Sequence, residues 1–168
     1  MKSLEINELR ERYAVERDDR EFSLGDTLDV KTSVILLVVV FLAEQSSHFF
    51  ESPLTRSEWW MQFVSVASLI VAGIFAVLEL CPRDYGTEGS PTRYDEWIEK
   101  LKTYYSESDN PDSLVFEQAI KGRAERARER AELNIVANKK KSMFLRVAFW
   151  FTVASFSINL ATLAMRLF

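Results

Sequence analysis

The side chains in this sequence best suited to chemistry are Glu44 and His48, which follow the apolar run from Val34 to Ala43. A spacing of four places both on one face of a helix. Ionisable groups at membrane depth are costly, and they commonly face a bundle interior or a water-filled path. We therefore treat Glu44, Ser47 and His48 as candidate pore-lining residues. The alternative is that the span ends at Ala43, which leaves these three side chains in the outer head-group layer.

A second polar set lies in the last apolar block, where Ser155, Asn159 and Thr162 follow one another at spacings of four and three. Such a face suits a hydrogen-bonded seam between helices, and it is equally compatible with the lining of an oligomeric pore. Glu79, close to the end of the second apolar block, resembles Glu44. The alternative for Glu79 is that it lies at a solvated helix end.

Other kinds of chemistry find little support. The single cysteine, Cys81, excludes a disulfide within the chain, and we expect it to be a free thiol near the membrane surface. The sequence has no glycine-rich phosphate loop, no metal-ligand spacing and no paired catalytic carboxylates. Arginine and glutamate alternate from Arg123 to Glu132, which favours a solvated, salt-bridged helix over a nucleic-acid site. We expect no enzyme, no catalytic residue, no metal and no cofactor.

The elements that position these residues follow from how the composition is distributed. Charged residues make up 27% of the chain, but they concentrate in residues 1–30 and 82–142. Most valine, leucine, isoleucine and phenylalanine lie in three blocks, around residues 34–43, 59–81 and 143–168. This segregation, with few glycines and prolines, predicts an all-α membrane protein with three transmembrane helices and cytoplasmic N-terminal and central helices.

The apolar spacing and the turn residues predict where the helices begin and end. We expect a charged helix over residues 3–22, a break at Ser23, Gly25 and Asp26, and a first span from Thr27 to Phe50 capped by Asp26. A second span should cover residues 60–80. An amphipathic helix should start between Thr92 and Asp95.

The charged segment 114–142 contains almost no helix breaker, so it should run into the third span, 147–165, as one helix of more than fifty residues. We expect a bend in so long a helix, with Gly122 as one candidate. The expected divisions of the chain are the cytoplasmic N-terminal helix 1–26, the transmembrane hairpin 27–81, the cytoplasmic helical segment 82–142 and the third transmembrane helix 143–168.

Basic residues indicate the orientation. Six lysines and arginines precede the first apolar run, one lies between the first two spans, and twelve lie in residues 82–142. The positive-inside rule therefore places the N-terminus and the central segment in the cytoplasm and the C-terminus outside. The basic residues at the entry to the third span should contact lipid head groups: Lys139, Lys140, Lys141 and Arg146.

In layout the chain resembles the small bacterial membrane effectors of antiphage defence, in particular those of Pycsar systems and the related SLATT type. The residues that carry the resemblance are the segment DVKTSVILL starting at Asp29, the second span ending at Pro82, and KKKSMFLR leading into the last span. The polar second half of the first helix, with Glu44 and His48, departs from the simple apolar span of this group.

The resemblance implies an effector in the bacterial inner membrane that oligomerises on a signal, disrupts the membrane and stops the infected cell. In that group a nucleotide-synthesising enzyme senses infection, so the implied partners are a cyclic nucleotide or a cytosolic defence protein, besides the bilayer and further copies of the chain. The alternative function is a non-conducting membrane adaptor that recruits a cytosolic defence enzyme.

Overall fold

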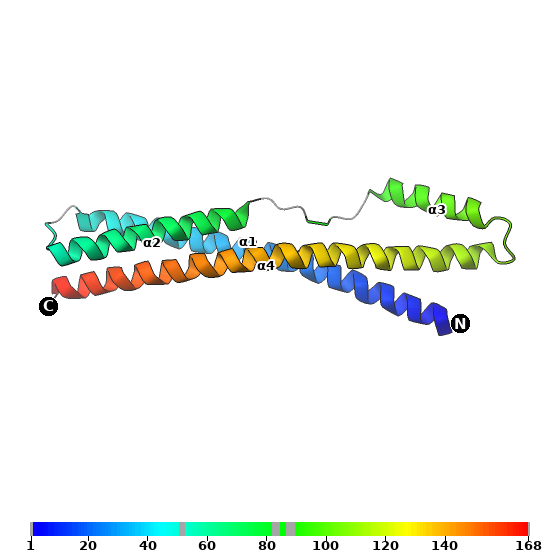
Figure 1. The fold of residues 1–168 in the computed structure, drawn as a ribbon, viewed down its shortest axis with the longest axis horizontal. Helices are drawn as coiled ribbons and strands as arrows, with labels where there is room; N and C mark the ends of the chain where they lie inside the picture. The colour runs from blue at the N-terminus through cyan, green and yellow to red at the C-terminus, as the bar shows by residue number, and fades with distance from the viewer. Residues whose placement is uncertain (1, 51–52, 82–84, 87–89, 168) are drawn as a thin grey trace. The chain divides into compact units, whose positions relative to one another are not determined.

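The computed structural model describes residues 2–50, 53–81, 85–86 and 90–167. Within these ranges the chain forms four α-helices and no strand, which confirms the all-α prediction. The helices are α1 (Lys2–Phe50), α2 (Arg56–Leu80), α3 (Pro91–Tyr105) and α4 (Pro111–Leu167) (Figure 1). Pro82, expected to end the second span, lies outside the described residues.

Helix α1 contradicts the predicted break before the first span, because it runs without interruption from Lys2 to Phe50. Gly25 is buried inside this helix, and neither Gly25 nor any other described glycine has a positive φ. A glycine in a helix interior costs only about 1 kcal/mol relative to alanine. The packing of the buried face of α1 outweighs that cost, so Asp26 lies within the helix and does not cap it.

Helix α2 begins four residues earlier than predicted, at Arg56. Thr55 and Glu58 form a capping box, in which the Glu58 amide donates to Thr55 Oγ1 at 3.3 Å and the Thr55 amide donates to Glu58 Oε2 at 2.8 Å. The spacing Thr-x-x-Glu is the sequence signature of this arrangement. Thr55 is therefore the N-cap, and Arg56 and Ser57 already belong to the helix.

Helix α4 confirms the prediction of one long helix, since its 57 residues contain both the charged segment and the last apolar block. It begins at Pro111, whose fixed φ and missing N–H suit the first helical position. The helix continues through Gly122, where we had considered a bend. α3 likewise begins with a proline, after Ser90 and slightly before the predicted Thr92–Asp95 region.

The chain divides into two compact units. The first contains residues 1–24 and 84–137, and the second contains residues 25–83 and 138–168. In the first unit Arg130 Nε donates to Asp18 Oδ2 at 2.7 Å and Asn134 Nδ2 donates to Asp18 Oδ1 at 3.3 Å. Asn134 also accepts the Gly86 amide at 3.0 Å. These bonds join α1, α4 and the segment before α3.

Helix α3 packs on α4 in the first unit through an aromatic side chain. The Arg126 guanidinium lies 4.4 Å from the centre of the Trp97 ring, a cation–π distance. Trp97 reaches this position because it lies against Gly122, where an added Cβ would come within 2.7 Å of the ring. The Trp97 ring occupies the space that a side chain at residue 122 would need, and this packing explains the glycine there.

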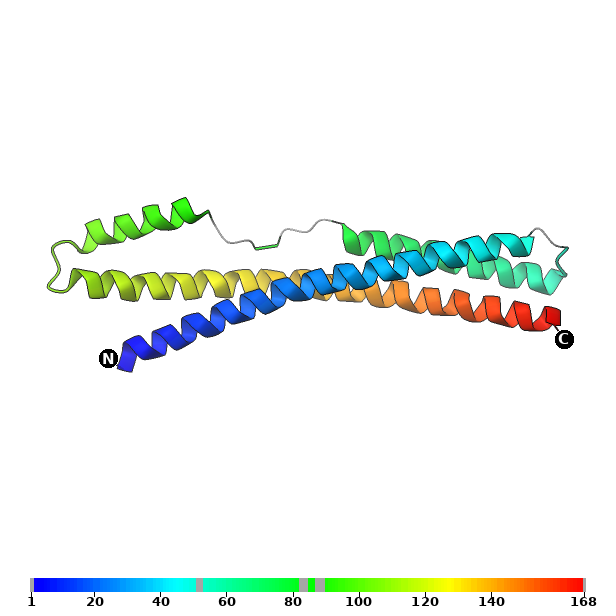
Figure 2. The same ribbon diagram turned by 180° about the vertical axis from the view of Figure 1, so that it is seen from behind.

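The second unit contains α1 from Gly25 onward, α2, and α4 from Asn138 onward. Helices α1 and α4 are parallel, since Asp29 contacts Lys141 and Ser46 contacts Asn159. α2 is antiparallel to α4, since Phe75 lies beside Phe144 and Glu58 pairs with Arg166. Figure 2 shows the same three helices from behind.

The close approach of Trp97 to Gly122 predicts opposite effects of alanine at two helical glycines. Gly122→Ala forces the ring away and should destabilise the docking of α3 by about 1–3 kcal/mol, the usual cost of overpacking. Amide hydrogen exchange in α3 should accelerate about tenfold. Gly73→Ala is the matched control, because its Cβ would lie 3.9 Å from Val39 and it gains helix propensity. Equal amide exchange rates in α3 of the Gly122→Ala and Gly73→Ala variants would contradict this role of Gly122.

Candidate functional site

The polar residues of the second unit converge on the interface between its three helices. All the buried residues of α2 except Ser68 follow one another at spacings of four and three, and these are Glu58, Gln62, Ser65, Leu69, Ala72, Ala76 and Glu79. The buried face of α4 keeps the same register through Lys141, Ala148, Thr152, Ser155, Asn159 and Thr162. This 3.5-residue repeat is the pattern of coiled-coil packing. We call this buried face the polar seam.

Four side chains form the centre of the polar seam. Ser65 Oγ lies 2.7 Å from Ser155 Oγ and donates to Asn159 Oδ1 at 3.1 Å. Asn159 Nδ2 donates in turn to Ser46 Oγ at 3.1 Å. The cluster therefore ties α1, α2 and α4 together. Thr162 is also buried, and its hydroxyl donates to the Ile158 carbonyl of its own helix at 3.0 Å.

The ion pair of Glu58 with Arg166 and the amide of Gln62 complete the polar seam near the start of α2. Arg166 Nε lies 3.1 Å from Glu58 Oε1, and its guanidinium lies 5.2 Å from the centre of the Phe49 ring. Between this ion pair and Ser65, Gln62 is fully buried, and neither polar atom of its amide has a hydrogen-bond partner among the described residues. We did not single out Gln62 from the sequence, although its heptad spacing from Glu58 and Ser65 is a signal that could have found it.

The outer surface of the second unit has the opposite character. Its exposed side chains are large and apolar, among them Val34, Leu37, Phe41, Phe63, Ile74, Trp150, Phe156 and Leu160. A water-soluble bundle hides such residues and exposes polar ones. In lipid the preference reverses, because the chains of the bilayer solvate apolar side chains and small polar residues hold helices together. The second unit is built in this reversed way.

Two helices, α2 and α4, are long and apolar enough to cross a membrane. Only 28% of the most apolar stretch of each is buried, whereas the core helix of a soluble protein is mostly buried. α1 is not one of these two helices. Three spans therefore stay a prediction, although α1 packs along both α2 and α4 in the second unit.

The structure separates the two sets of predicted pore-lining residues. Ser155, Asn159 and Thr162 are buried among helices of the same chain, which matches the packing alternative. Glu44, Ser47 and His48 are exposed on the other side of α1. Ser47 Oγ donates to the Glu44 carbonyl at 2.7 Å, as an exposed serine in a helix often does.

The depth of Glu44 and His48 follows from the contact of Ser46 with Asn159. Ser46 lies beside Asn159, and α1 and α4 are parallel. Glu44 therefore lies level with residue 157 of α4, and His48 lies level with residue 161. Both levels fall inside the predicted third span, 147–165. Glu44 and His48 are thus exposed ionisable groups beside the exposed Gln45 and Ser47, on a unit whose outer surface is mainly apolar.

The predicted head-group contacts differ among themselves. Lys139, Lys140 and Arg146 are exposed, whereas Lys141 is buried and forms an ion pair with Asp29. Glu79 is also fully buried, so its solvated-end alternative is wrong. The reason is its position on the seam face of α2, one heptad after Ala72.

Cys81 follows Glu79 at the end of α2 and is exposed as a free thiol, as expected.

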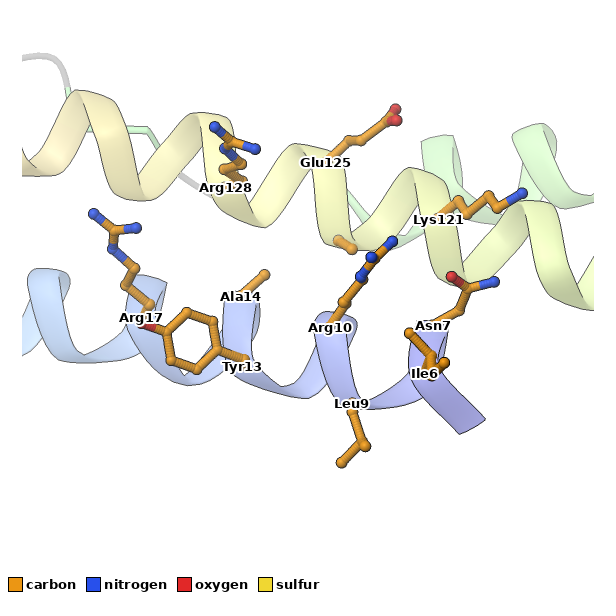
Figure 3. Close-up of a pocket in the computed structure, with 11 residues that line it drawn as sticks. Ile6, Asn7, Leu9, Arg10, Tyr13, Ala14, Arg17, Lys121, Glu125 and Arg128 are labelled. Atoms are coloured by element: carbon orange, nitrogen blue, oxygen red, sulfur yellow. The ribbon is translucent and has the colours of Figure 1, made fainter. Parts of the chain in front are cut away.

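A cavity of about 710 Å³ lies in the first unit, between the N-terminal part of α1 and α4. Its lining includes the cations Arg10, Arg17, Lys121 and Arg128, the ring of Tyr13 and one acid, Glu125. Figure 3 shows Arg10 and Arg17 extending from α1 toward α4, while Glu125 points away from α1. We call it the basic pocket. Guanidinium groups bind phosphate and carboxylate in a bidentate manner, so the pocket suits an anion.

Helices with a polar interior and an apolar surface, joined to a charged helical unit, define a helical membrane protein with a water-exposed part. The comparison with protein families identifies which one. The family model for the Pycsar effector protein domain matches residues 23–168, so the chain belongs to this family of antiphage defence effectors. This confirms the resemblance to Pycsar effectors. No curated protein and no solved structure matches the chain.

The hydrogen bonds of Asn159 predict that it stabilises the second unit. Asn159→Ala removes its bonds to Ser46 and Ser65 and should lower the free energy of unfolding in detergent micelles by about 1–2 kcal/mol, as for other interhelical hydrogen bonds in membranes. Ser157→Ala is the control, because the exposed Ser157 bonds only to the Val153 carbonyl of its own helix. A loss of equal size in both variants would show that the seam bonds are not stabilising.

Proposed function

We propose that this Pycsar effector permeabilises the bacterial inner membrane, through an ion path that forms where several subunits bring their Glu44–His48 faces together. The observation that carries the proposal is the exposure of Glu44, Ser47 and His48 at the depth of the predicted third span, where, with Gln45, they interrupt a surface that is mainly apolar. A charged or imidazole side chain facing lipid is costly. Contact between subunits around water removes that cost.

Three transmembrane helices per subunit fit this proposal. α1 beyond Gly25 pairs with α4 at Asp29 and at Ser46, and so runs alongside a candidate span for about five turns. The large apolar side chains that it exposes between these contacts suit lipid, and they are Val30, Val34, Leu37, Val38, Val40 and Phe41. With three spans, the distribution of basic residues supports a cytoplasmic N-terminus and an outward C-terminus.

The polar seam has a supporting role in the proposal. The side chains of Ser46, Ser65 and Asn159 hold each subunit together without exposing polar groups to lipid. The path is assigned to the opposite side of α1. Oligomer formation thus requires no rearrangement of the three helices within a subunit.

A test of the path exchanges the charge between two adjacent positions. Glu44→Gln should reduce the preference of the open channel for cations, seen as a shift of the reversal potential toward zero in a potassium chloride gradient across a planar bilayer. In the double variant Glu44→Gln with Gln45→Glu the net charge is restored one position away. Because residue 45 lies about 100° around the helix from residue 44, cation preference should not return.

Two results would contradict the proposal. Unchanged selectivity in Glu44→Gln would show that the path does not pass Glu44. Absence of any conductance from the wild-type protein, together with a cytosolic protein that co-purifies in a fixed ratio, would replace the pore with the non-conducting adaptor.

We further propose that the activating signal is a cyclic nucleotide and that it binds the basic pocket. Arg10 and Arg17 supply charge for a phosphate, and Tyr13 offers an aromatic face for a base. The pocket volume of about 710 Å³ lies in the range of small-molecule sites, about 300–1,000 Å³. All lining residues belong to the first unit.

Arg17→Gln tests this assignment. Loss of a charge-assisted contact should raise the concentration of cyclic nucleotide needed for half-maximal dye release from vesicles by about tenfold. Arg20→Gln is the control, since Arg20 is exposed on the same helix and does not line the pocket. Equal shifts in both variants would mean that only the overall charge of α1 matters, and the site would then lie elsewhere.

A further inference from the structure

A second concave surface lies in the second unit, between α1 and α4, and has a different chemistry. It has a volume of about 500 Å³ and is walled mainly by Val34, Ile35, Leu145 and Phe149, with Lys31 and Arg146 also lining it. We call it the lipid groove. It lies just beyond the contact between Asp29 and Lys141, where α1 and α4 enter the apolar part of the unit.

The two cations of the lipid groove have no partner in the described structure. Lys31 and Arg146 are exposed and form no ion pair among the described residues. Lys141, only a turn away, is buried, and Asp29 neutralises it. The Asp29 carboxylate is therefore engaged. The groove keeps two positive charges beside its apolar walls, Lys31 near its start and Arg146 about level with Val34.

We propose that the lipid groove binds one anionic phospholipid in each subunit, with the phosphate between Lys31 and Arg146 and an acyl chain along Val34, Ile35, Leu145 and Phe149. Charge complementarity selects an anionic head group, and the apolar walls select a long hydrocarbon chain. Neither a free phosphate nor a water-soluble peptide offers both. This is a defined site, distinct from diffuse attraction of lysines to a charged membrane surface.

The site follows from the membrane location of the family and the geometry of the groove, and it does not depend on ion conduction. A helix pair that holds a lipid between its members gains contacts that neither helix makes alone. Because the groove joins α1 to α4, an anionic lipid seated in it would stabilise the packing of α1 on α4. Bilayers rich in phosphatidylglycerol should therefore stabilise the second unit more than bilayers of phosphatidylcholine.

Native mass spectrometry of the full chain in detergent tests the proposal, with phosphatidylglycerol and phosphatidylcholine of the same acyl chains as probes. We expect one phosphatidylglycerol per subunit to survive where phosphatidylcholine is lost. Lys31→Gln and Arg146→Gln should each weaken phosphatidylglycerol binding about fivefold. The control is Lys140→Gln, which removes an equal charge from an exposed lysine outside the groove. It should change binding little.

A steric variant separates the groove from its charges. Val34→Trp fills the channel and should abolish the retained lipid, whereas Val40→Trp, at an exposed position of α1 outside the groove, should not. Equal binding of both lipids would overturn the proposal. Equal loss in Lys140→Gln and Arg146→Gln would overturn it in favour of diffuse attraction. A change of oligomeric state in Val34→Trp alone would assign the groove to a neighbouring subunit.

Discussion

The second unit depends on one constraint, which is that its helices must satisfy polar side chains among themselves while their outer surface meets hydrocarbon. The hydroxyl and amide groups of Ser46, Ser65, Ser155 and Asn159 bond to one another at the centre of three helices. Every one of these bonds has a partner on α4, so all of them would be lost if α4 left. Small residues in the same register, such as Ala72 and Ala148, let the helices approach closely enough for those bonds. Close packing and hydrogen bonding are thus coupled.

The first unit exposes both charged and large apolar side chains, and it buries a charged group between its helices. Asp18 is largely buried, and it is matched by Arg130 and Asn134, so its charge is compensated. Pairs at the surface, such as Arg128 with Glu132, contribute little to stability. α1 and α4 each supply residues to both units, so one helix must present a charged face over part of its length and an apolar face over the rest. This explains why neither helix is amphipathic as a whole.

Much of this organisation could be predicted from the sequence, because the segregation of charged and apolar blocks reflects the solvent around each part. The fusion of the charged segment with the last span followed from the lack of breakers between Leu114 and Ser142. The break at Gly25 was wrong, since local propensity is weak beside tertiary packing. The start of α2 was placed at residue 60 because the prediction followed the apolar run, whereas the capping box of Thr55 with Glu58 starts the helix at Arg56.

The candidate site was only partly predictable, because a spacing of three and four fixes a face of a helix but not what lies opposite it. Asn159 and Glu44 looked alike as polar residues in apolar blocks, yet one is buried in the seam and the other is exposed. Gln62 escaped notice because a single glutamine carries no motif. Its significance comes from neighbours on other helices.

The capping box at the start of α2 also bears on how the protein is made. Glu58 accepts from the backbone of Thr55 and contacts Arg166, which is synthesised more than a hundred residues later. While the ribosome is still translating α4, the hairpin of α1 and α2 has an acidic side chain whose basic partner does not yet exist. During that interval the hydrogen bonds of the capping box are the contacts that the Glu58 carboxylate makes. Assembly is complete only when the last helix brings its arginine alongside.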